Sequence, residues 1–359
     1  MTLRIAVSGL ACDARASGVR ARLLGWLREL APMLAGGEEV SLLWSASVPL
    51  PDLPPAIAPV LLPIPPAPAW RRALGEWHGV GRALAERGVD LLDQGHLPLV
   101  APRNVGVVLT VHDLRDLGPF RRRPRWLARA VLMHALRRAR CVVVPSATTA
   151  QGVRALGVDP ARLQVVPNAV PRELAGVVRE TPRHFLHVGH LEARKNLGML
   201  LEAYARLRAV APAAPPLVLA GHDAGAGPAL RARSQRLGIA ERVTLPGAVP
   251  PAALRELYAG AAAVCVPSHE EGHGMAALEG LAAGAPVLVS ECGALPETVG
   301  EHGTVLPPDD PAAWALALRA ALLDRDPRRA AARRAFATRF TWHDAAARIL
   351  ALWRGVSRG

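Results

Sequence analysis

The segment that decides the fold reads VCVPSHEEGHGMAALEGLAA and spans residues 264–283. It begins with a short apolar run, Val264–Pro267, which predicts a buried strand. A loop containing glycines follows, and the small and apolar residues from Met275 to Ala283 predict a helix. A strand, a loop and a helix in this order form one unit of a parallel sheet. Open sheets of this kind bind ligands at the carboxyl ends of their strands, so the loop is the first candidate site.

The same alternation of strands and helices continues on both sides of this segment. The further strands that we expect are Arg4–Ser8, Val40–Trp44, Leu91–Leu92, Val105–Val111, Cys141–Val144, His184–Val188, Leu217–Ala220, Val243–Leu245 and Val287–Ser290. The further helices that we expect are Ala21–Leu34, Trp126–Arg138, Leu197–Arg208, Pro251–Tyr258, Trp314–Leu323 and those between Arg328 and Trp353. The proline-rich stretch Pro49–Pro68 is expected to be a loop.

The alternation stops at Asn168–Pro182 and then restarts, which indicates a domain boundary. A chain of 359 residues is also too long for one ordinary core. We therefore predict an α/β protein of two Rossmann-like domains with parallel sheets. The expected bounds are 1–172 for the first domain, 173–337 for the second and 338–359 for a C-terminal helix.

The formal net charge of +13 comes almost wholly from arginine, since Lys195 is the only lysine. A basic surface favours anionic partners such as nucleotide phosphates, acidic lipid headgroups or nucleic acid. The basic runs Arg121–Arg123 and Arg137–Arg140 have no interleaved aromatic residues. They are interpreted as solvated faces, and no nucleic-acid partner is expected, whereas peripheral contact with an anionic membrane stays open.

The cysteines and the N-terminus bear on the cellular compartment. Cys12, Cys141, Cys265 and Cys292 are far apart and follow no metal-binding spacing. Cys141 and Cys265 lie in apolar runs, which favours thiols in the protein core. The apolar run at the N-terminus is too brief for a signal peptide, and no apolar stretch reaches the ~18 residues of a membrane span. We expect a cytoplasmic protein, with the inner membrane face as a further option.

Two carboxylates flank the helix start in the opening segment. Glu271 lies in the loop after the strand, just before Gly272 and Gly274. Glu279 lies one turn into an otherwise apolar helix. The glycines let a ligand approach the backbone, and free N–H groups at a helix start suit a phosphate. A buried carboxylate needs a polar partner, which ribose hydroxyls would supply at Glu279. The alternative for Glu279 is an exposed helix residue.

The loop after the strand His184–Val188 carries a basic pair. Gly189 opens this loop, and Arg194 and Lys195 stand just before the next expected helix. Adjacent cations beside a helix start form a diphosphate clamp, and a compact ammonium is not interchangeable with arginine. The alternative is a solvated pair of surface charges.

The first domain offers weaker candidates. His112 and Asp113 follow the strand Val105–Val111, so the imidazole is placed at the carboxyl end of the sheet. The loop Asp13–Arg20, with Gly18, follows the first strand and is a candidate for the acceptor side, together with Asp113. A turn histidine on the surface is the alternative for His112.

Residues 269–273, HEEGH, match the H-E-x-x-H pattern of zinc peptidases. That chemistry needs both histidines on one face of a continuous helix. Pro267 before the motif and the glycines within and after it disfavour a helix, so we expect no metal site and no metal cofactor. A Walker loop and a G-x-G-x-x-G after the first strand are both absent.

At these residues the chain resembles the family-four group of retaining glycosyltransferases, which have the GT-B fold. The segments that carry the resemblance are 110–114 (TVHDL), 143–146 (VVPS), 165–170 (VVPNAV), 188–196 (VGHLEARKN), 219–221 (LAG), 245–247 (LPG), 267–279 and 290–297 (SECGALPE). Two glutamates with seven residues between them, here Glu271 and Glu279, are typical of that family. The departures are His273, where an aromatic residue is usual, and a reduced glycine-rich start at residues 16–19.

The resemblance implies a role for each site residue. The sheets of the two domains would face each other across a cleft, and the last helix would cross back to the first domain. Glu279 would hold the ribose of a nucleotide, Arg194 and Lys195 would neutralise the diphosphate, and Glu271 would contact the hydroxyls of the donor sugar. His112 would bind the donor sugar from the first domain, and the backbone of Gly293, Ala294 and Leu295 would complete the phosphate site.

The resemblance predicts a metal-independent hexosyltransferase that moves a sugar from a nucleotide-sugar donor to a glycan, a lipid-linked or a small-molecule acceptor. GDP-mannose is the first choice of donor and UDP-glucose the second. The alternatives are a nucleotide-sugar epimerase or hydrolase of the same fold, and a non-catalytic nucleotide-sugar-binding or membrane-associated scaffold protein.

Overall fold

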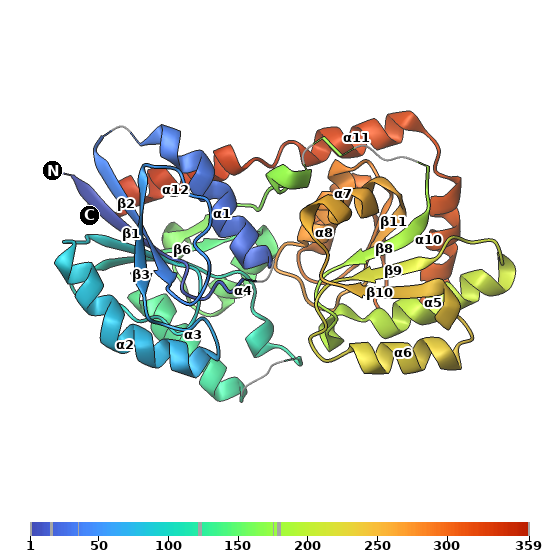
Figure 1. Cartoon of the computed structure of the whole chain (residues 1–359), viewed down its shortest axis with the longest axis horizontal. Coiled ribbons are helices and arrows are strands. Elements are labelled where there is room, and N and C mark those ends of the chain that lie inside the picture. Colours follow the sequence, from blue (N-terminus) through green and yellow to red (C-terminus); the bar gives the residue numbers. More distant parts are fainter. Residues whose placement is uncertain are drawn as a thin grey trace. The chain divides into compact units, whose positions relative to one another are not determined.

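The computed structural model describes residues 2–14, 17–34, 36–120, 124–174, 176–177 and 181–357. The chain divides into two compact units, here called unit 1 (residues 1–168 and 341–359) and unit 2 (residues 169–340). Each unit contains a fully parallel sheet, which confirms the expected α/β class (Figure 1). The basic run Arg121–Arg123 lies outside the described residues.

The described part of unit 1 contains a seven-stranded sheet in the order β3-β2-β1-β4-β5-β6-β7. Its strands are β1 (Leu3–Ser8), β2 (Glu38–Ser45), β3 (Ile57–Leu62), β4 (Leu91–Gln94), β5 (Gly106–Thr110), β6 (Cys141–Val144) and β7 (Leu163–Val165). Its helices are α1 (Gly18–Leu30), α2 (Ala69–Glu86), α3 (Arg125–Arg138), α4 (Ala147–Ala155) and α12 (Trp342–Ser357).

The expectation that Pro49–Pro68 is only a loop is wrong, because β3 lies inside it. β3 pairs in parallel with β2 and forms the edge of the sheet. An edge strand can contain a proline, here Pro59, since one side of its backbone needs no ladder partner. The prolines therefore mask the strand in the sequence without preventing it.

The C-terminal helix α12 packs on α1 within unit 1 (Figure 1). The rings of Trp26 and Trp353 meet edge to face at 5.7 Å between centroids. The indole N–H of Trp353 donates to Oδ2 of Asp93 at 2.9 Å. A side chain at Gly25 would collide with the ring of Trp342, so a glycine is required for this close packing. These contacts attach the last segment of the chain to the first sheet.

The described part of unit 2 contains a six-stranded sheet in the order β10-β9-β8-β11-β12-β13. Its strands are β8 (His184–Val188), β9 (Leu217–Ala220), β10 (Val243–Gly247), β11 (Ala261–Val266), β12 (Val287–Ser290) and β13 (Thr304–Leu306). Its helices are α5 (Leu197–Val210), α6 (Gly227–Arg236), α7 (Pro251–Ala259), α8 (Met275–Ala282), α9 (Leu295–Val299), α10 (Pro311–Leu323) and α11 (Pro327–Ala337).

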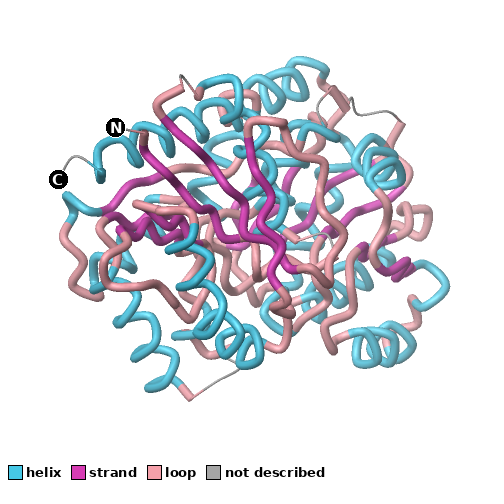
Figure 2. The backbone as a smooth tube through the Cα atoms, turned by 60° about the vertical axis from the view of Figure 1, so that its left-hand side comes forward, coloured by secondary structure: helices cyan, strands magenta, loops and turns pink. Residues whose placement is uncertain are grey.

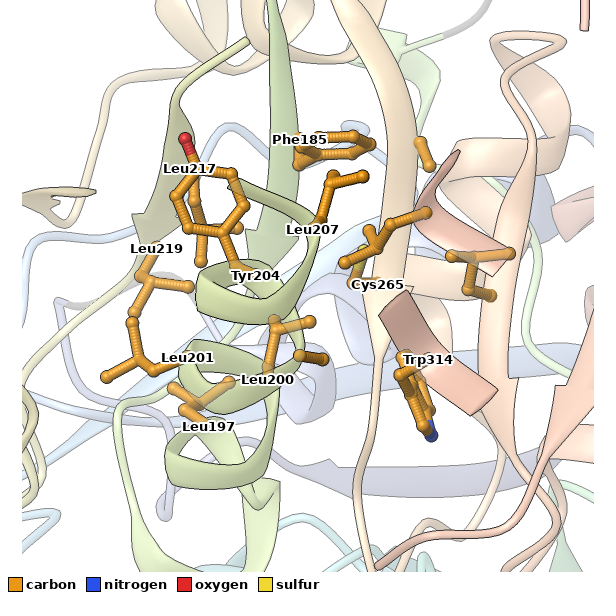
Figure 3. Packing of buried hydrophobic residues seen from close by; sticks show 14 of the residues in the cluster. Phe185, Leu197, Leu200, Leu201, Tyr204, Leu207, Leu217, Leu219, Cys265 and Trp314 are labelled. Atoms are coloured by element: carbon orange, nitrogen blue, oxygen red, sulfur yellow. The ribbon is translucent and has the colours of Figure 1, made fainter. Parts of the chain in front are cut away.

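Helices cover both faces of the sheet in unit 2, because separate core clusters lie on its two sides; Figure 2 shows helices in cyan and strands in magenta along the whole backbone. On one face α5 places Leu200, Tyr204 and Leu207 against the sheet, with Trp314 of α10 beside them (Figure 3). The ring of Tyr204 meets that of Phe185 on β8 at 6.1 Å, and its hydroxyl donates to the carbonyl of Pro215. This core holds β8 rigidly, and the candidate site begins at the end of that strand.

Within the described residues, no helix is long and apolar enough to span a membrane.

Candidate nucleotide-sugar site

The strand order of unit 2 reverses between β8 and β11, which is where open α/β sheets bind their ligands. The loop after β8 forms a short 3₁₀ turn, Ala193–Lys195, that ends at Asn196 in the left-handed conformation. The loop after β11 runs to Gly274, whose positive φ of 90° precedes α8. The two loops are tied together, because the N–H of His269 donates to the carbonyl of Arg194 at 2.8 Å.

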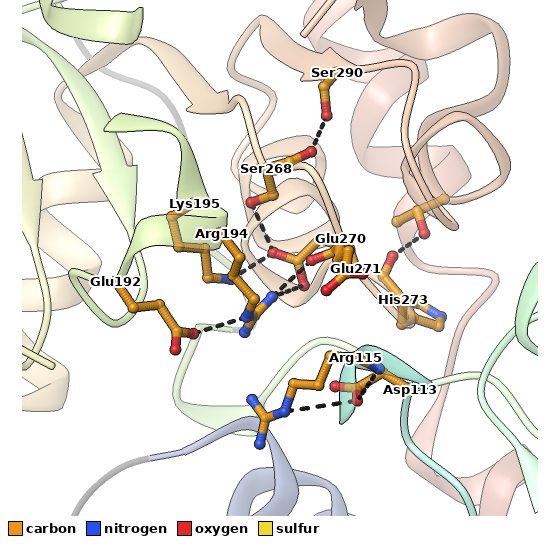
Figure 4. A network of polar contacts seen from close by, with 11 residues as sticks. Asp113, Arg115, Glu192, Arg194, Lys195, Ser268, Glu270, Glu271, His273 and Ser290 are labelled. Atoms are coloured by element: carbon orange, nitrogen blue, oxygen red, sulfur yellow. Dashed lines mark hydrogen bonds and ion pairs between the residues drawn. The ribbon is translucent and has the colours of Figure 1, made fainter. Parts of the chain in front are cut away.

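The two loops bring Arg194, Lys195 and Glu271 together, as the sequence predicted for one site (Figure 4). Nζ of Lys195 donates to Oε1 of Glu271 at 2.5 Å, and the lysine side chain is only 10% exposed. Nη1 of Arg194 lies 3.6 Å from Oε2 of Glu271 and donates to the carbonyl of Glu270. The alternative of solvated surface charges is therefore wrong for this pair.

The cations are balanced by carboxylates of the protein itself. Nε of Arg194 lies 2.8 Å from Oε1 of Glu192, in addition to the pairing with Glu271. Two positive and two negative side chains give this group a formal charge near zero. Both cations are thus already paired with carboxylates of the protein, which the sequence did not reveal.

Glu271 is ionised at neutral pH. Burial alone would raise the pKa of its carboxyl, but the charges of Lys195 and Arg194 and hydrogen bonds from Lys195 and Ser268 lower the pKa to about 2. Ser268 donates from Oγ to Oε1 of Glu271 at 3.0 Å, and Ser290 in turn donates to the carbonyl of Ser268. The carboxylate can thus accept hydrogen bonds but cannot supply a proton near pH 7.

Glu279 is buried on α8, so the alternative of an exposed helix residue is wrong. Its Oε2 accepts a hydrogen bond of 2.5 Å from the hydroxyl of Tyr258 on α7. Burial raises the pKa of Glu279 to about 7, although the hydrogen bond from Tyr258 acts in the opposite direction. Tyr258 therefore provides part of the hydrogen bonding to Glu279 that the sequence analysis assigned to ribose hydroxyls.

The glycines of the site leave space beside the charged groups. A Cβ on Gly189 would lie 3.7 Å from Nζ of Lys195, so a side chain at this position would pack directly against the ammonium. Gly272 and Gly274 lie in the loop just before α8, and the N–H groups of Met275 and Ala276 start that helix. The first N–H groups of a helix have no partner inside it and favour an anion.

Two of the three backbone N–H groups of Gly293–Leu295 already donate within the protein. The N–H of Ala294 donates to the carbonyl of Glu271 at 3.0 Å, and that of Leu295 donates to Cys292 at 3.4 Å. A Cβ on Gly293 would lie 2.5 Å from the carbonyl oxygen of Glu271. This segment therefore fixes the loop that carries Glu271, and its role in phosphate binding stays a prediction.

His112 lies in unit 1, two residues after β5. Its ring borders a small cavity of about 30 Å³ that Cys12, Arg22 and Asp93 also line, which is room for about one water molecule. Burial, together with the charge of Arg22, lowers the pKa of His112 to about 3, so the imidazole is neutral at pH 7. Its role toward the donor sugar stays a prediction.

The two residues assigned to the acceptor side have local structural roles. Oδ1 of Asp113 accepts from the N–H of Arg115 at 3.2 Å, which closes the turn after β5. Gly18 is the first residue of α1, and Oγ of the preceding Ser17 caps that helix by accepting from the N–H of Arg20. Residues 15 and 16 of this loop lie outside the described residues. Nothing in these contacts tests a part in acceptor binding.

Residues 269–273 form a loop before α8, so the H-E-x-x-H match does not lie on a helix, as expected. Among the residues that the structure describes, no group of three or more histidine, cysteine or acidic side chains is placed to hold a metal. Cys141 and Cys265 are buried, as expected for core thiols; Cys12 is also buried, and Cys292 is partly buried.

Sequence reasoning missed several polar residues of the site. Tyr258 lies 21 positions before Glu279, and no local pattern connects the two. His187 points from β8 to the same region; burial and the charge of Lys195 lower its pKa to about 4. Ser268 and Glu192 carried a usable signal, because each lies in a strand-end loop within three residues of a predicted site residue.

Two family models match the chain. "Glycosyltransferase Family 4" covers residues 18–174, and "Glycosyl transferases group 1" covers residues 182–324. The "D-inositol 3-phosphate glycosyltransferase" of Segniliparus rotundus is 32% identical over 219 residues, which are 56% of this chain and 49% of the relative. The "O-antigen chain mannosyltransferase B" of Escherichia coli is 34% identical over 161 residues, which are 44% of this chain and 42% of the relative.

The chain thus spans about half the length of these curated relatives. Among solved structures, sucrose-phosphate synthase from Thermosynechococcus elongatus matches with a TM-score of 0.80 at 22% identity, covering 99% of each chain. This likeness shows the fold, which is that of the GT-B glycosyltransferases. With both halves matched by its models, the chain belongs to the group 1, family 4 glycosyltransferases.

Proposed function

We propose that the protein is a glycosyltransferase whose nucleotide-sugar donor binds to unit 2, at the carboxyl ends of β8 and β11. The observation that carries the proposal is the cluster of Arg194, Lys195 and Glu271, joined by the 2.5 Å contact between Nζ and Oε1. Family membership supports it, since the matching models describe glycosyl transferases.

Lys195 is the group best suited to the leaving diphosphate. An ammonium has three N–H donors, and one of them is used by Glu271. Gly189 adds no side chain beside Nζ, although the ring of His187 also lies next to this glycine. Charge that builds on the departing phosphate would be stabilised by Lys195, Arg194 and the start of α8. These groups could perform the task of a metal, so we propose a metal-independent reaction.

The two glutamates would contact different parts of the donor. Glu271 is ionised and would accept hydrogen bonds from sugar hydroxyls. Glu279 uses Oε2 for Tyr258, so ribose hydroxyls would donate to its other oxygen. Because the carboxylate is the stronger acceptor, ribose binding would favour the ionised form of Glu279.

We further propose that the reaction retains the anomeric configuration and transfers a hexose, with mannose from GDP-mannose as the first choice. The similarity to a relative named as an O-antigen chain mannosyltransferase supports mannose. UDP-glucose is the second choice. The acceptor would be a glycan, a lipid-linked or a small molecule; the relative named for D-inositol 3-phosphate supports the small-molecule class.

A donor panel tests this function. Thermal shift with GDP-mannose, UDP-glucose and the free nucleotides identifies the base, and mass spectrometry of products with and without acceptors follows. A sugar–acceptor conjugate supports transfer, and NMR of its anomeric proton reports the configuration. Sugar release that no acceptor increases indicates a hydrolase, an isomerised nucleotide sugar indicates an epimerase, and binding without turnover of any donor indicates a non-catalytic protein.

A further inference from the structure

Helix α2 exposes a stripe of large apolar side chains. Its buried residues, among them Glu76, Val80 and Leu84, face the core of unit 1. On the outer side Trp70, Leu74 and Trp77 are 63%, 56% and 74% exposed. The spacing of four and then three residues places these three side chains on one face of the helix. Two tryptophans this exposed, two turns apart on one face, are unusual for a surface in contact only with water.

Helix α3 has a similar outer face. Leu132 and Leu136 are buried, whereas Trp126 is 72% exposed. Trp126 borders an open hollow of about 400 Å³ along the helix, whose lining includes Met133, Arg129 and Arg137. The tryptophan and the two arginines thus share one side of α3.

The two outer faces point to the same side of unit 1. Val80 and Leu84 of α2 pack in one cluster with Leu92 of β4, and Leu132 and Leu136 of α3 pack with Val107 of β5. Leu92 and Val107 are paired neighbours in the parallel ladder, so their side chains leave the sheet on the same face. Both helices therefore cover that face, as Figure 1 also shows for unit 1.

The charges around these tryptophans are positive. Residues 124–138 contain no aspartate or glutamate, and Arg125, Arg129 and Arg137 are exposed on α3. On α2 the guanidinium of Arg71 stacks over the ring of Trp70 at 5.2 Å, and Glu76 is turned inward to Arg72 and His96. Glu86 is exposed, but it pairs with Arg82 at the end of the helix. Along the two helices the acidic groups are thus buried or paired, and arginines lie beside Trp70 and Trp126; the exposed Asp116 lies on the short turn that contacts α3.

We infer that the outer faces of α2 and α3 form a docking surface for an anionic lipid bilayer. Tryptophan rings favour the boundary between headgroups and acyl chains, and arginines beside them attract anionic headgroups. The positive charge that suggested anionic partners in the sequence is thereby assigned in part to the exposed arginines of α2 and α3. The inference does not depend on the proposed catalysis, although such a surface would bring an enzyme to lipid-linked acceptors.

Vesicle sedimentation with the full chain tests the inference. We expect binding to vesicles of phosphatidylcholine with phosphatidylglycerol. Binding to vesicles of phosphatidylcholine alone should be weaker by roughly tenfold or more. Trp70→Ser with Trp77→Ser should reduce binding to the anionic vesicles about tenfold or more. Arg129→Gln with Arg137→Gln should reduce it about tenfold and make it less sensitive to salt.

A matched control comes from unit 2, where Leu316 and Leu323 of α10 are 68% and 78% exposed. Leu316→Ser with Leu323→Ser should bind vesicles like the unaltered protein. Thermal unfolding should be unchanged in every variant, since the altered side chains are exposed. The inference is overturned if the folded protein ignores anionic vesicles, or if the tryptophan variant binds as well as the control. Sedimentation velocity without lipid adds a third outcome: self-association that the tryptophan variant abolishes would make this face a protein interface.

Discussion

Glu271 and Glu279 are two carboxylates of unit 2 with seven residues between them, and their pKa values move in opposite directions. Glu271 lies among Lys195, Arg194 and Ser268, and its pKa falls to about 2. Glu279 accepts a hydrogen bond from the hydroxyl of Tyr258, and burial raises its pKa to about 7. Burial opposes ionisation at both positions, so the difference comes from the neighbouring cations. The same residue type thus provides a permanent anion in the loop and a proton-binding group on the helix.

Removal of Lys195 should have the largest effect on activity. A donor aimed at the charge that develops on the diphosphate acts more strongly in the transition state than in the ground state. We expect Lys195→Ala to lower kcat roughly 100-fold or more, with a smaller change in donor KM. Lys195→Arg keeps the charge that stabilises Glu271, but it should also be impaired because a planar guanidinium cannot replace a compact ammonium.

Steady-state kinetics with the donor identified by the panel check this prediction. Arg206→Ala removes an exposed cation from α5 and serves as the control, with kcat and KM expected to stay near those of the unaltered protein. Circular dichroism should establish that each variant is folded. A kcat for Lys195→Ala near that of the control would refute the role of Lys195 at the leaving group.

Loss of Glu279 should weaken nucleotide binding without loss of the fold. Each hydrogen bond to a charged group contributes ~1.5–3 kcal/mol, so Glu279→Ala should reduce affinity for the nucleoside diphosphate about tenfold or more. Calorimetric titration measures this. Glu256→Ala alters an exposed glutamate of α7 and should bind like the unaltered protein. Equal affinities in the two variants would exclude Glu279 from the ribose site.

The stability of the protein should depend on pH through both glutamates, with opposite signs. The pKa of Glu279 is raised from 4.5 to about 7, so the folded state holds the proton more tightly. Its stabilising contribution is full below pH 4.5 and is lost as the pH rises through 7. The pKa of Glu271 is lowered to about 2, so its contribution is full above pH 4.5 and is lost as the pH falls toward 2.

Urea unfolding between pH 3 and 8 separates the two. Each unit of pKa shift corresponds to about 1.4 kcal/mol. Glu279→Gln should flatten the dependence above pH 4.5, and Glu271→Gln should flatten it below that pH. If Glu279→Gln retains the slope of the unaltered protein between pH 5 and 7, another group accounts for it.

Much of the fold could be read from the sequence because parallel strands buried on both faces are short apolar runs. Leu217–Ala220 and Val287–Ser290 have the predicted bounds. β3 was missed because prolines dominate its surroundings, and only its position at the sheet edge makes them tolerable. Periodicity reports burial along one element, but it does not report which side of the sheet that element occupies.

The site was predicted as a set of residues but not as an electrostatic arrangement. The sequence placed Lys195 and Glu271 at the ends of strands that the topology makes neighbours. It could not show that the two side chains pair with each other, nor that Tyr258 reaches Glu279. The first pair is 76 positions apart in the chain and the second pair 21, so both contacts depend on the tertiary structure.

Chelation should have the smallest effect. If Lys195, Arg194 and the start of α8 stabilise the diphosphate, EDTA should leave kcat unchanged. Elemental analysis of the purified protein should find no stoichiometric zinc at residues 269–273. A tightly held zinc whose removal abolishes turnover would replace the cationic mechanism with a metal-assisted one.

The most direct test of the account is the proton balance of donor binding. Glu279, with a pKa of about 7, is largely protonated at pH 6, and ribose binding should drive it to the carboxylate. Calorimetry with GDP-mannose or UDP-glucose, whichever binds, in buffers of different ionisation enthalpy counts the protons released. A sugar-linked diphosphate has no ionisation of its own near this pH. The account predicts the release of nearly one proton by the unaltered protein and none by Glu279→Gln; donor binding by the unaltered protein without proton release would contradict it.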